Sequence, residues 1–195
     1  MKNMSRTLMT LALMSMTAGV FAQVNAGASA SGSVGTPATG VAAEEQFQAR
    51  DARQQQKVEQ GLQSGDLSVK QAGQLERREA HIEKMEAHDL KNGPITAQEQ
   101  ANINAAQNRE YGALKRDESA GAVNNPNSRS AQRMQKDVQR DANQDRRIAN
   151  GVKDGQLNER QAARLDAGAA HVDAKESVDA RNGHVSAREQ AGIQR

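Results

Sequence analysis

The sequence predicts an all-α fold of two duplicated three-helix units, built as antiparallel helical hairpins and preceded by a disordered N-terminal linker. Two observations support this prediction. The chain is rich in Gln, Ala, Glu, Arg and Lys, which lose little side-chain freedom in a helix. In addition, Arg50–His81 aligns without gaps with Arg140–His171, and many residues are identical in the two segments. Self-similarity of this kind indicates an internal duplication.

The supply of large apolar side chains limits the core. The chain has 195 residues but no Trp, one Tyr and two Phe. Large apolar side chains provide most of the free energy of burial, roughly 1.5–3 kcal/mol each. We therefore expect a thin core between Ala-rich helices that approach each other closely. A partly disordered or marginally stable chain is the alternative.

The first 22 residues read as a secretory signal peptide. Lys2 and Arg6 form its positive start, and a short apolar run follows. Val20-Phe21-Ala22 fits the small-residue cleavage pattern, so we expect cleavage between Ala22 and Gln23 and a periplasmic location. The run is shorter than the ~20 apolar residues that a membrane span needs, so we expect no transmembrane segment after cleavage.

Charge argues against a nucleic-acid partner. The whole chain has 26 basic and 24 acidic residues, and Lys2 and Arg6 are the only charged residues among the first 22. The mature chain would therefore be formally neutral. Binding to nucleic acid needs clustered positive charge, usually with aromatic platforms where single strands are bound. Neither feature is visible in the sequence.

The remaining chain divides by composition. Residues 23–43 are rich in Gly, Ala and Ser and predict a flexible linker. The first helical unit is expected at 44–116, a turn-forming linker at 117–128 and the second unit at 129–195. The predicted helices are 44–63, 69–91 and 97–116 in the first unit, and 129–152, 159–181 and 187–195 in the second.

Four corners repeat one pattern, in which a Gly is followed by an aliphatic residue, a capping residue and a Gln or Glu. The Gly can adopt the left-handed conformation that ends a helix. The capping side chain and the Gln or Glu three residues later can form a capping box that starts the next helix. The corners are Gly65 with Ser68 and Gln71, Gly93 with Thr96 and Glu99, Gly155 with Asn158 and Gln161, and Gly183 with Ser186 and Glu189.

The second unit looks shorter than the first. Its last predicted helix stops just after Ile193, the counterpart of Ile103, whereas the helix in the first unit continues through Tyr111 and Leu114. We therefore expect the second unit to pack less well or to lean on another structure.

Calcium binding at the corners is one alternative to a purely structural role. Their residue order matches the back half of an EF-hand loop, which binds calcium through six or more oxygen atoms. The front half does not match, because His88 and Leu90 occupy positions that need oxygen ligands, and two of the loops end in Gln. The order therefore favours capped corners over a calcium site. The corner residues that match are Asn92, Gly93, Ile95, Thr96 and Glu99.

A copper site is a second alternative. His81, Met85 and His88 have the spacing of one helical face, and imidazole with thioether suits copper. The duplicated segment has Lys175 and Val178 in place of Met85 and His88, so it keeps a single possible ligand. This pattern favours Met85 as core filler and the histidines as exposed polar residues.

Glu79, Glu83 and Glu86 also share a helical face. Runs of charge on helices are usually solvent-exposed, and basic residues lie close by in the sequence, so we expect an exposed face here. We find no nucleophile motif, phosphate loop or zinc signature. The sequence thus predicts no catalytic residue, no enzyme activity and no committed cofactor.

The segments "GVKDGQLNERQAARLD" and "NGPITAQEQANINAAQNRE" resemble uncharacterised exported proteobacterial proteins with a helical G-x-L-T-x-x-E repeat. The resemblance covers about residues 50–116 and 140–195. It implies an all-helical build and a periplasmic location, and it brings no activity, cofactor or catalytic residue. The duplication and the short final helix depart from the pattern.

Together these features predict a non-catalytic exported protein that acts by binding a protein partner or by self-association. The first alternative is a divalent metal-binding module that uses the EF-hand-like corners or the His/Met face. The second is a periplasmic stress chaperone of the holdase type, whose weakly cored helices shield unfolded chains.

Overall fold

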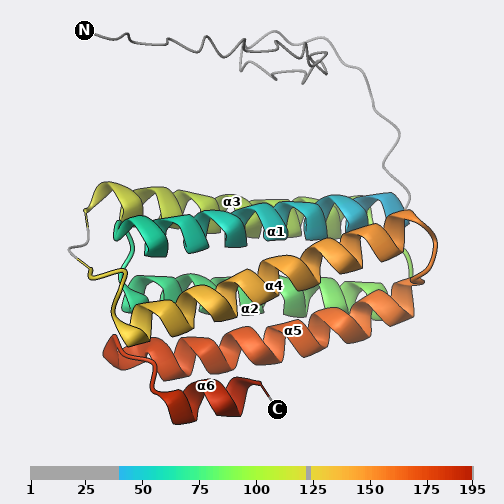
Figure 1. Ribbon diagram of the computed structural model, residues 1–195. Helices are drawn as coiled ribbons and strands as arrows, with labels where there is room; N and C mark the ends of the chain where they lie inside the picture. Colours follow the sequence, from blue (N-terminus) through green and yellow to red (C-terminus); the bar gives the residue numbers. More distant parts are fainter. Residues whose placement is uncertain (1–39, 122–123, 195) are drawn as a thin grey trace, which may run out of the picture. The chain divides into compact units, whose positions relative to one another are not determined.

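The computed structural model describes residues 40–121 and 124–194, and all of its helices belong to one compact unit. The described residues form no strand, so the predicted all-α class is confirmed (Figure 1). None of the described helices is long and apolar enough to cross a membrane. The elements are α1 (Gly40–Ser64), α2 (Val69–Lys91), α3 (Ala97–Ser119), α4 (Arg129–Lys153), α5 (Glu159–Asp179), the 3-10 helix η1 (Ala180–Asn182) and α6 (Ala187–Ile193).

The predicted helix starts agree with the structure except at α1. That helix begins at Gly40, inside the segment predicted as a linker, because Ala43 and Phe47 are buried in the bundle and hold its first turns in place. At the other ends, α3 continues to Ser119, and α5 gives way to η1 at Ala180. The predicted signal peptide and most of the predicted linker lie outside the described residues.

All four predicted corners form as expected. Gly65, Gly93, Gly155 and Gly183 have φ values of 87°, 126°, 68° and 78°, which are left-handed conformations that Gly adopts without strain. A complete capping box follows each glycine and starts α2, α3, α5 and α6. In the Thr96 box, Thr96 N–H donates to Glu99 Oε2 at 2.8 Å, and Glu99 N–H donates to Thr96 Oγ1 at 3.3 Å. The corners therefore fix where each helix begins and ends.

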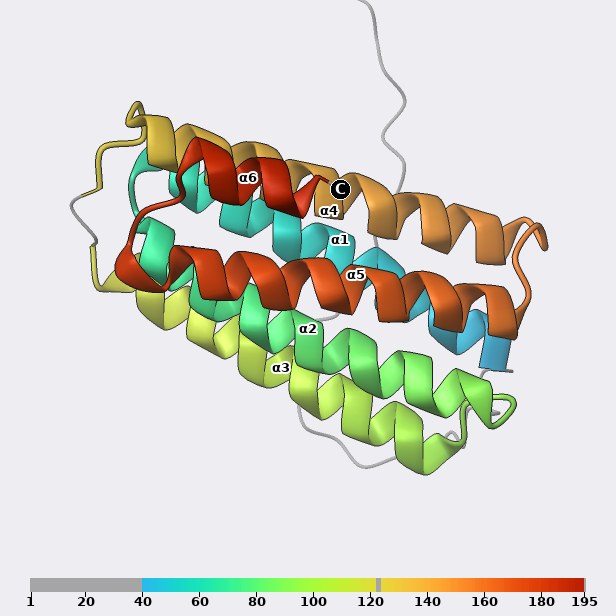
Figure 2. The ribbon, with the colours of Figure 1, turned by 90° about the horizontal axis from the view of Figure 1, so that it is seen from below.

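The two duplicated halves combine into one bundle. Helix α1 packs mainly against its duplicate α4, and α2 packs mainly against its duplicate α5. The helices within each of these pairs run antiparallel (Figure 1). Helix α3 lies along α1 and α2, and the shorter α6 lies against α4 and α5 (Figure 2). The contacts that close the bundle are thus made between the halves more than within them.

Small side chains line the seams between the paired helices. Where α2 packs against the end of α5 and the following η1, Gly73 faces Ala180 of η1, and a Cβ atom built on Gly73 would lie 2.5 Å from the Ala180 Cβ. That contact is far too short, so the glycine allows the two backbones to approach. The expectation of closely packed Ala-lined helices is correct. The fully or nearly fully buried alanines of α2 and α5 are Ala72, Ala80, Ala87, Ala162, Ala163, Ala169 and Ala170.

The larger apolar side chains gather in two clusters. One contains Leu62, Leu67, Leu75 and Met134. The other contains Phe47, Ile82, Leu90, Ile103 and Ile148. Leu114 also belongs to the first cluster and Ile95 to the second, and alanines and valines complete both, so the apolar core is as thin as the composition predicts.

The Gly73 contact makes a direct test of the seam. We expect Gly73→Ala to lower the free energy of unfolding by about 1–3 kcal/mol, because the added methyl group overpacks the contact with Ala180. Urea denaturation followed by circular dichroism would measure the change.

Gly168→Ala is the matched control, because Gly168 also lies within a helix but a Cβ atom there meets nothing within 4 Å. This change should raise the free energy of unfolding by up to about 1 kcal/mol through helix propensity. If the two substitutions changed the free energy of unfolding equally, the contact between Gly73 and Ala180 would not be as close as described.

Candidate metal centre

The interior of the bundle carries an unusual concentration of acidic side chains. Buried acids usually have a cationic partner or a metal ion. Here no Lys, Arg or His belongs to the buried part of the described chain. The buried acids, which we call the acidic core, are Glu44, Asp51, Glu76, Glu79, Glu83, Glu86, Glu110, Asp137, Asp141, Asp145, Asp166, Asp173 and Glu176.

Helical periodicity places these acids together. Along α2, the residues Glu76, Glu79, Glu83 and Glu86 follow one another at intervals of three or four, so they share one face of the helix. The same face carries their apolar neighbours, which explains why packing draws the acids inward. The other three long helices of the two pairs contribute acids to the same interior.

A first group of three acids joins α1, α2 and α5. One carboxylate oxygen each from Glu44, Glu86 and Asp166 lies within 4.8 Å of the other two. The amide of Gln48 bridges two of the three, because its Nε2 donates to Glu86 Oε2 at 3.1 Å and to Asp166 Oδ1 at 2.9 Å. Gln48 therefore orients both carboxylates and leaves their second oxygens, Glu86 Oε1 and Asp166 Oδ2, without a donor from the described residues.

A second group joins α2, α4 and α5. Oxygen atoms of Glu76, Asp141 and Asp173 again lie within 4.8 Å of one another. Gln55 Nε2 donates to Glu76 Oε2 at 2.9 Å, and the second oxygen, Glu76 Oε1, has no donor. The two groups thus share a design in which a buried glutamine fixes one oxygen of a glutamate and leaves the other free.

Each group contains one acid whose two oxygens both lack a donor. Both carboxylate oxygens of Glu44 in the first group, and both of Asp173 in the second, are buried and accept no hydrogen bond from any described residue while the neighbouring acids are ionised. Leaving a buried acceptor unpaired costs about 1–3 kcal/mol, and more when it is charged. The free oxygens of each group therefore form a set that a bound cation would satisfy.

Burial raises the pKa of these acids. Burial raises the pKa of Glu44 to about 7, although contacts with Asp166 and Gln48 oppose the change. Burial, followed by the charge of Glu44, raises the pKa of Asp166 to about 10. Burial and then the charge of Asp141 hold the pKa of Asp173 well above its ordinary value. Without a cation, the interior can accommodate its acids only by keeping several of them protonated.

Asp137 lies at the edge of the acidic core and differs from the rest. It forms an ion pair with Arg140 and accepts a hydrogen bond from Gln190 Nε2 at 3.3 Å. Burial raises its pKa, while Gln190 and Arg140 lower it. None of the other acids of the core forms an ion pair with a described residue.

The donor set decides which ions the two groups could hold. Carboxylate and amide oxygens suit Ca²⁺, Mg²⁺ and Mn²⁺, whereas copper and zinc favour nitrogen or sulfur ligands. Calcium–oxygen distances of about 2.3–2.6 Å allow two ligands of one ion to be separated by up to about 5 Å. The observed separations of up to 4.8 Å satisfy this limit.

The candidate ligands predicted from the sequence do not lie in these groups. His81 and His88 are exposed, and Met85 is half-buried against the apolar cluster that contains Phe47. Asn92 donates through Nδ2 to the carbonyl oxygen of His88, and Glu99 accepts from Thr96 in the capping box. The corner residues therefore hold helix ends together, as their capping pattern predicts.

The prediction of an exposed face at Glu79, Glu83 and Glu86 is wrong, because all three are buried. The internal duplication contains a signal that reveals this. Four acidic positions of the core stay acidic in both halves, although most exposed positions change. These pairs are Asp51 with Asp141, Glu76 with Asp166, Glu83 with Asp173, and Glu86 with Glu176.

Comparison with known proteins adds no relative. No protein-family model matches the chain, and searches for similar curated proteins and similar solved structures gave no match.

Proposed function

We propose that this protein is a non-catalytic, exported helical bundle that binds oxygen-preferring divalent cations, calcium foremost, in its acidic core. One observation supports the proposal above all others: in each of two groups, three buried carboxylates have oxygens within 4.8 Å of one another, several of their oxygens lack a hydrogen-bond donor, and none of the six forms an ion pair with a described basic side chain. Glutamines that orient the carboxylates support it further, because metal ligands are commonly held by such neighbours.

Electrostatics explains why cations would be taken up. Two carboxylates a few ångströms apart repel each other strongly in a medium of low effective dielectric. Protonation also removes this repulsion, and the raised pKa of Asp166 keeps that acid protonated at neutral pH. A divalent ion removes the repulsion and in addition satisfies the unpaired oxygens. Each group carries three carboxylates, enough to balance one divalent ion and to leave a residual negative charge.

Calcium is favoured over magnesium within this class. Magnesium gives up its water molecules reluctantly and is seldom held in a cage made wholly of protein. Calcium accepts six to eight oxygens in irregular geometry. The first group offers both oxygens of Glu44 and one each from Glu86 and Asp166, and the unpartnered Oε1 of Gln48 adds a fifth buried oxygen.

The proposal keeps the divalent-metal alternative of the sequence analysis but moves its site from the corners to the interior. Export stays part of the proposal on the strength of the apolar run and cleavage pattern in residues 1–22. Uptake into a buried site requires the helix pairs to separate briefly, so binding should be coupled to folding.

The two groups predict two calcium ions per chain. We expect Glu86→Gln to remove the ion of the first group and Asp173→Asn to remove that of the second, with at least about a tenfold loss of affinity at the altered site. Native mass spectrometry would count the ions, and calorimetry with calcium or manganese would give the affinities.

Asp154→Asn is the matched control, because Asp154 is an exposed acid at the corner between α4 and α5. It should leave both sites intact. In the absence of metal, the two core variants should be at least as stable as the parent protein, since an amide removes a buried charge. The proposal fails if the parent protein binds neither ion at millimolar concentration, or if both core variants still bind two ions.

The raised pKa values predict how stability depends on pH. Glu44, Glu110 and Asp141 each have a pKa of about 7 in the folded chain, against ordinary values of 4.5 or 3.8. The folded state therefore binds more protons than the unfolded state, and stability is lost as pH rises. We expect the metal-free protein to lose on the order of 3 kcal/mol or more between pH 5 and pH 8.

Saturating calcium should reduce this dependence, because the metal-bound carboxylates of the two groups, Glu44 and Asp141 among them, carry no proton. Calcium affinity should rise with pH, and calorimetry in two buffers with different ionisation enthalpies should detect released protons. The unfolding temperature of the metal-free protein should therefore fall between pH 5 and pH 8. An unfolding temperature that stays constant or rises over this range would contradict the description of the acidic core.

A further inference from the structure

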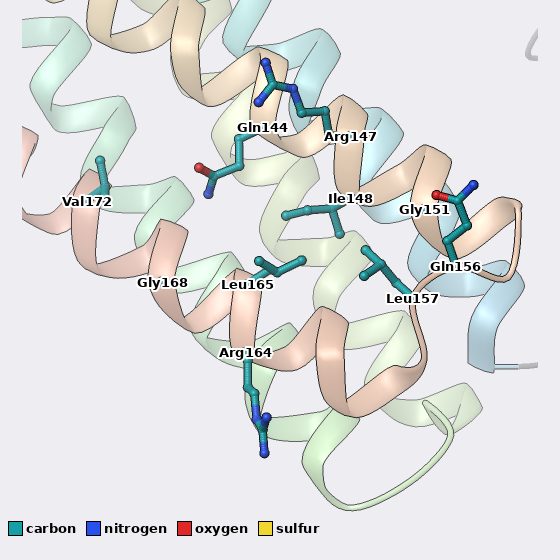
Figure 3. A pocket seen from close by; sticks show the side chains of 10 residues that line it. All are labelled: Gln144, Arg147, Ile148, Gly151, Gln156, Leu157, Arg164, Leu165, Gly168 and Val172. Atoms are coloured by element: carbon teal, nitrogen blue, oxygen red, sulfur yellow. The ribbon is translucent and has the colours of Figure 1, made fainter. Parts of the chain in front are cut away.

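A groove runs between α4 and α5 on the outer side of the second half. It has a volume of about 680 Å³, and its lining includes Ile148, Leu157 and Leu165. These three side chains point toward one another between the two helices, whereas Arg147 and Arg164 extend along the flanks (Figure 3). None of the residues that line it belongs to α6. The groove is therefore an apolar trough with a cation on each side.

The first half shows what fills the equivalent trough. The counterparts of Ile148, Leu157 and Leu165 are Val58, Leu67 and Leu75, which are only 1%, 0% and 1% exposed. They are buried in one cluster with Ala113 and Leu114 of α3. In the second half, Ile148 is also buried, at 3% exposed, but Leu165 is 40% exposed and Leu157 is half-buried. The same architecture thus exists once with a covering helix and once without it among the described residues.

Among the described residues, helix α6 corresponds to the first part of α3 and does not line the groove. Ile193 is buried, as is its counterpart Ile103. Beyond it, α3 presents Ala106, Ala113 and Leu114 to the first half, at helical spacings of seven and eight residues. Side chains with these sizes and spacings are what the open groove lacks.

We propose that the groove between α4 and α5 binds an amphipathic α-helix of a partner protein, which packs there as α3 packs on α1 and α2. The proposal is independent of cation binding. The expected partner is a helix with small and aliphatic side chains on one face, because α3, which packs at the equivalent place on the first half, has such a face.

The flanks specify further features of the partner. In the first half, Lys57 Nζ lies 5.5 Å from the centre of the Tyr111 ring, a cation–π contact with α3. Arg147 is the counterpart of Lys57 and lines the open groove, so it can make the same contact. With Arg164 on the opposite flank, the groove favours a helix with an aromatic residue or carboxylates at its edges.

The floor differs from that of the first half in one respect. Glu110 of α3 lies against Glu79 and close to Arg78. Their counterparts in the second half are Ala169 and Gly168, which carry no charge. The partner helix should therefore bear an apolar side chain where α3 bears Glu110.

A synthetic peptide of residues 97–119 is the natural probe, used in its native form and with Glu110→Leu. We expect the labelled Glu110→Leu peptide to bind the full chain in fluorescence anisotropy, at least five times more tightly than the native peptide. Leu165→Asp in the protein should weaken this binding at least tenfold. Val178→Asp is the matched control, because Val178 is an apolar side chain of α5, 51% exposed, that does not line the groove.

Three results would overturn the proposal. The first is no binding of either peptide at millimolar concentration to a protein whose helicity is intact. The second is binding that Leu165→Asp leaves unchanged, which would place the peptide elsewhere, for example in exchange with α3. The third is a dimer of the parent protein, seen by light scattering, that Leu165→Asp dissociates, because the groove would then be the site of a second copy.

Discussion

The structure depends on one electrostatic constraint: a bundle with few large apolar residues fills its interior with carboxylates, and among the described residues only Asp137 of this acidic core forms an ion pair with a basic side chain. Ionised acids in such a place repel one another and lack solvent, which works against the packing of the helices. Protons reduce this charge, because burial raises the pKa of Glu44 to about 7 and that of Asp166 to about 10. Folding and proton binding are thus linked through the same side chains, and the cation binding that we propose would use them as well.

The remaining features of the bundle make this interior possible. Alanines and Gly73 let α2 approach α5 closely, so the carboxylates meet in fixed register rather than in a loose, hydrated gap. Buried glutamines such as Gln48 and Gln55 orient individual oxygens. The glycine corners and capping boxes end and start the helices at defined residues. They thereby set the position of each acid along its helix relative to the corner.

The sequence predicts the local structure far better than the site. Capping residues and glycines act within a few residues of themselves, so the corners at Gly65 and Gly93 and the starts of α2 and α3 follow directly from the pattern. The early start of α1 depends on tertiary burial of Ala43, which the linker-like composition conceals. The burial of Glu83 depends on which helix covers it, and that partner comes from the other half of the chain. Helical periodicity alone cannot distinguish an acidic face that meets water from one that meets another acidic face.

The pairing of each helix with its own duplicate has a consequence for the origin of the chain. Because α1 pairs with α4 and α2 with α5, the arrangement has the form of a two-fold assembly whose two members are joined by the segment between α3 and α4. A lone half would expose its alanine seams and its acids and would have to associate with a second half to hide them. The architecture is that of a fused symmetric dimer, in which fusion frees the two halves to diverge: among the described residues, the long α3 packs on the first half and the short α6 on the second.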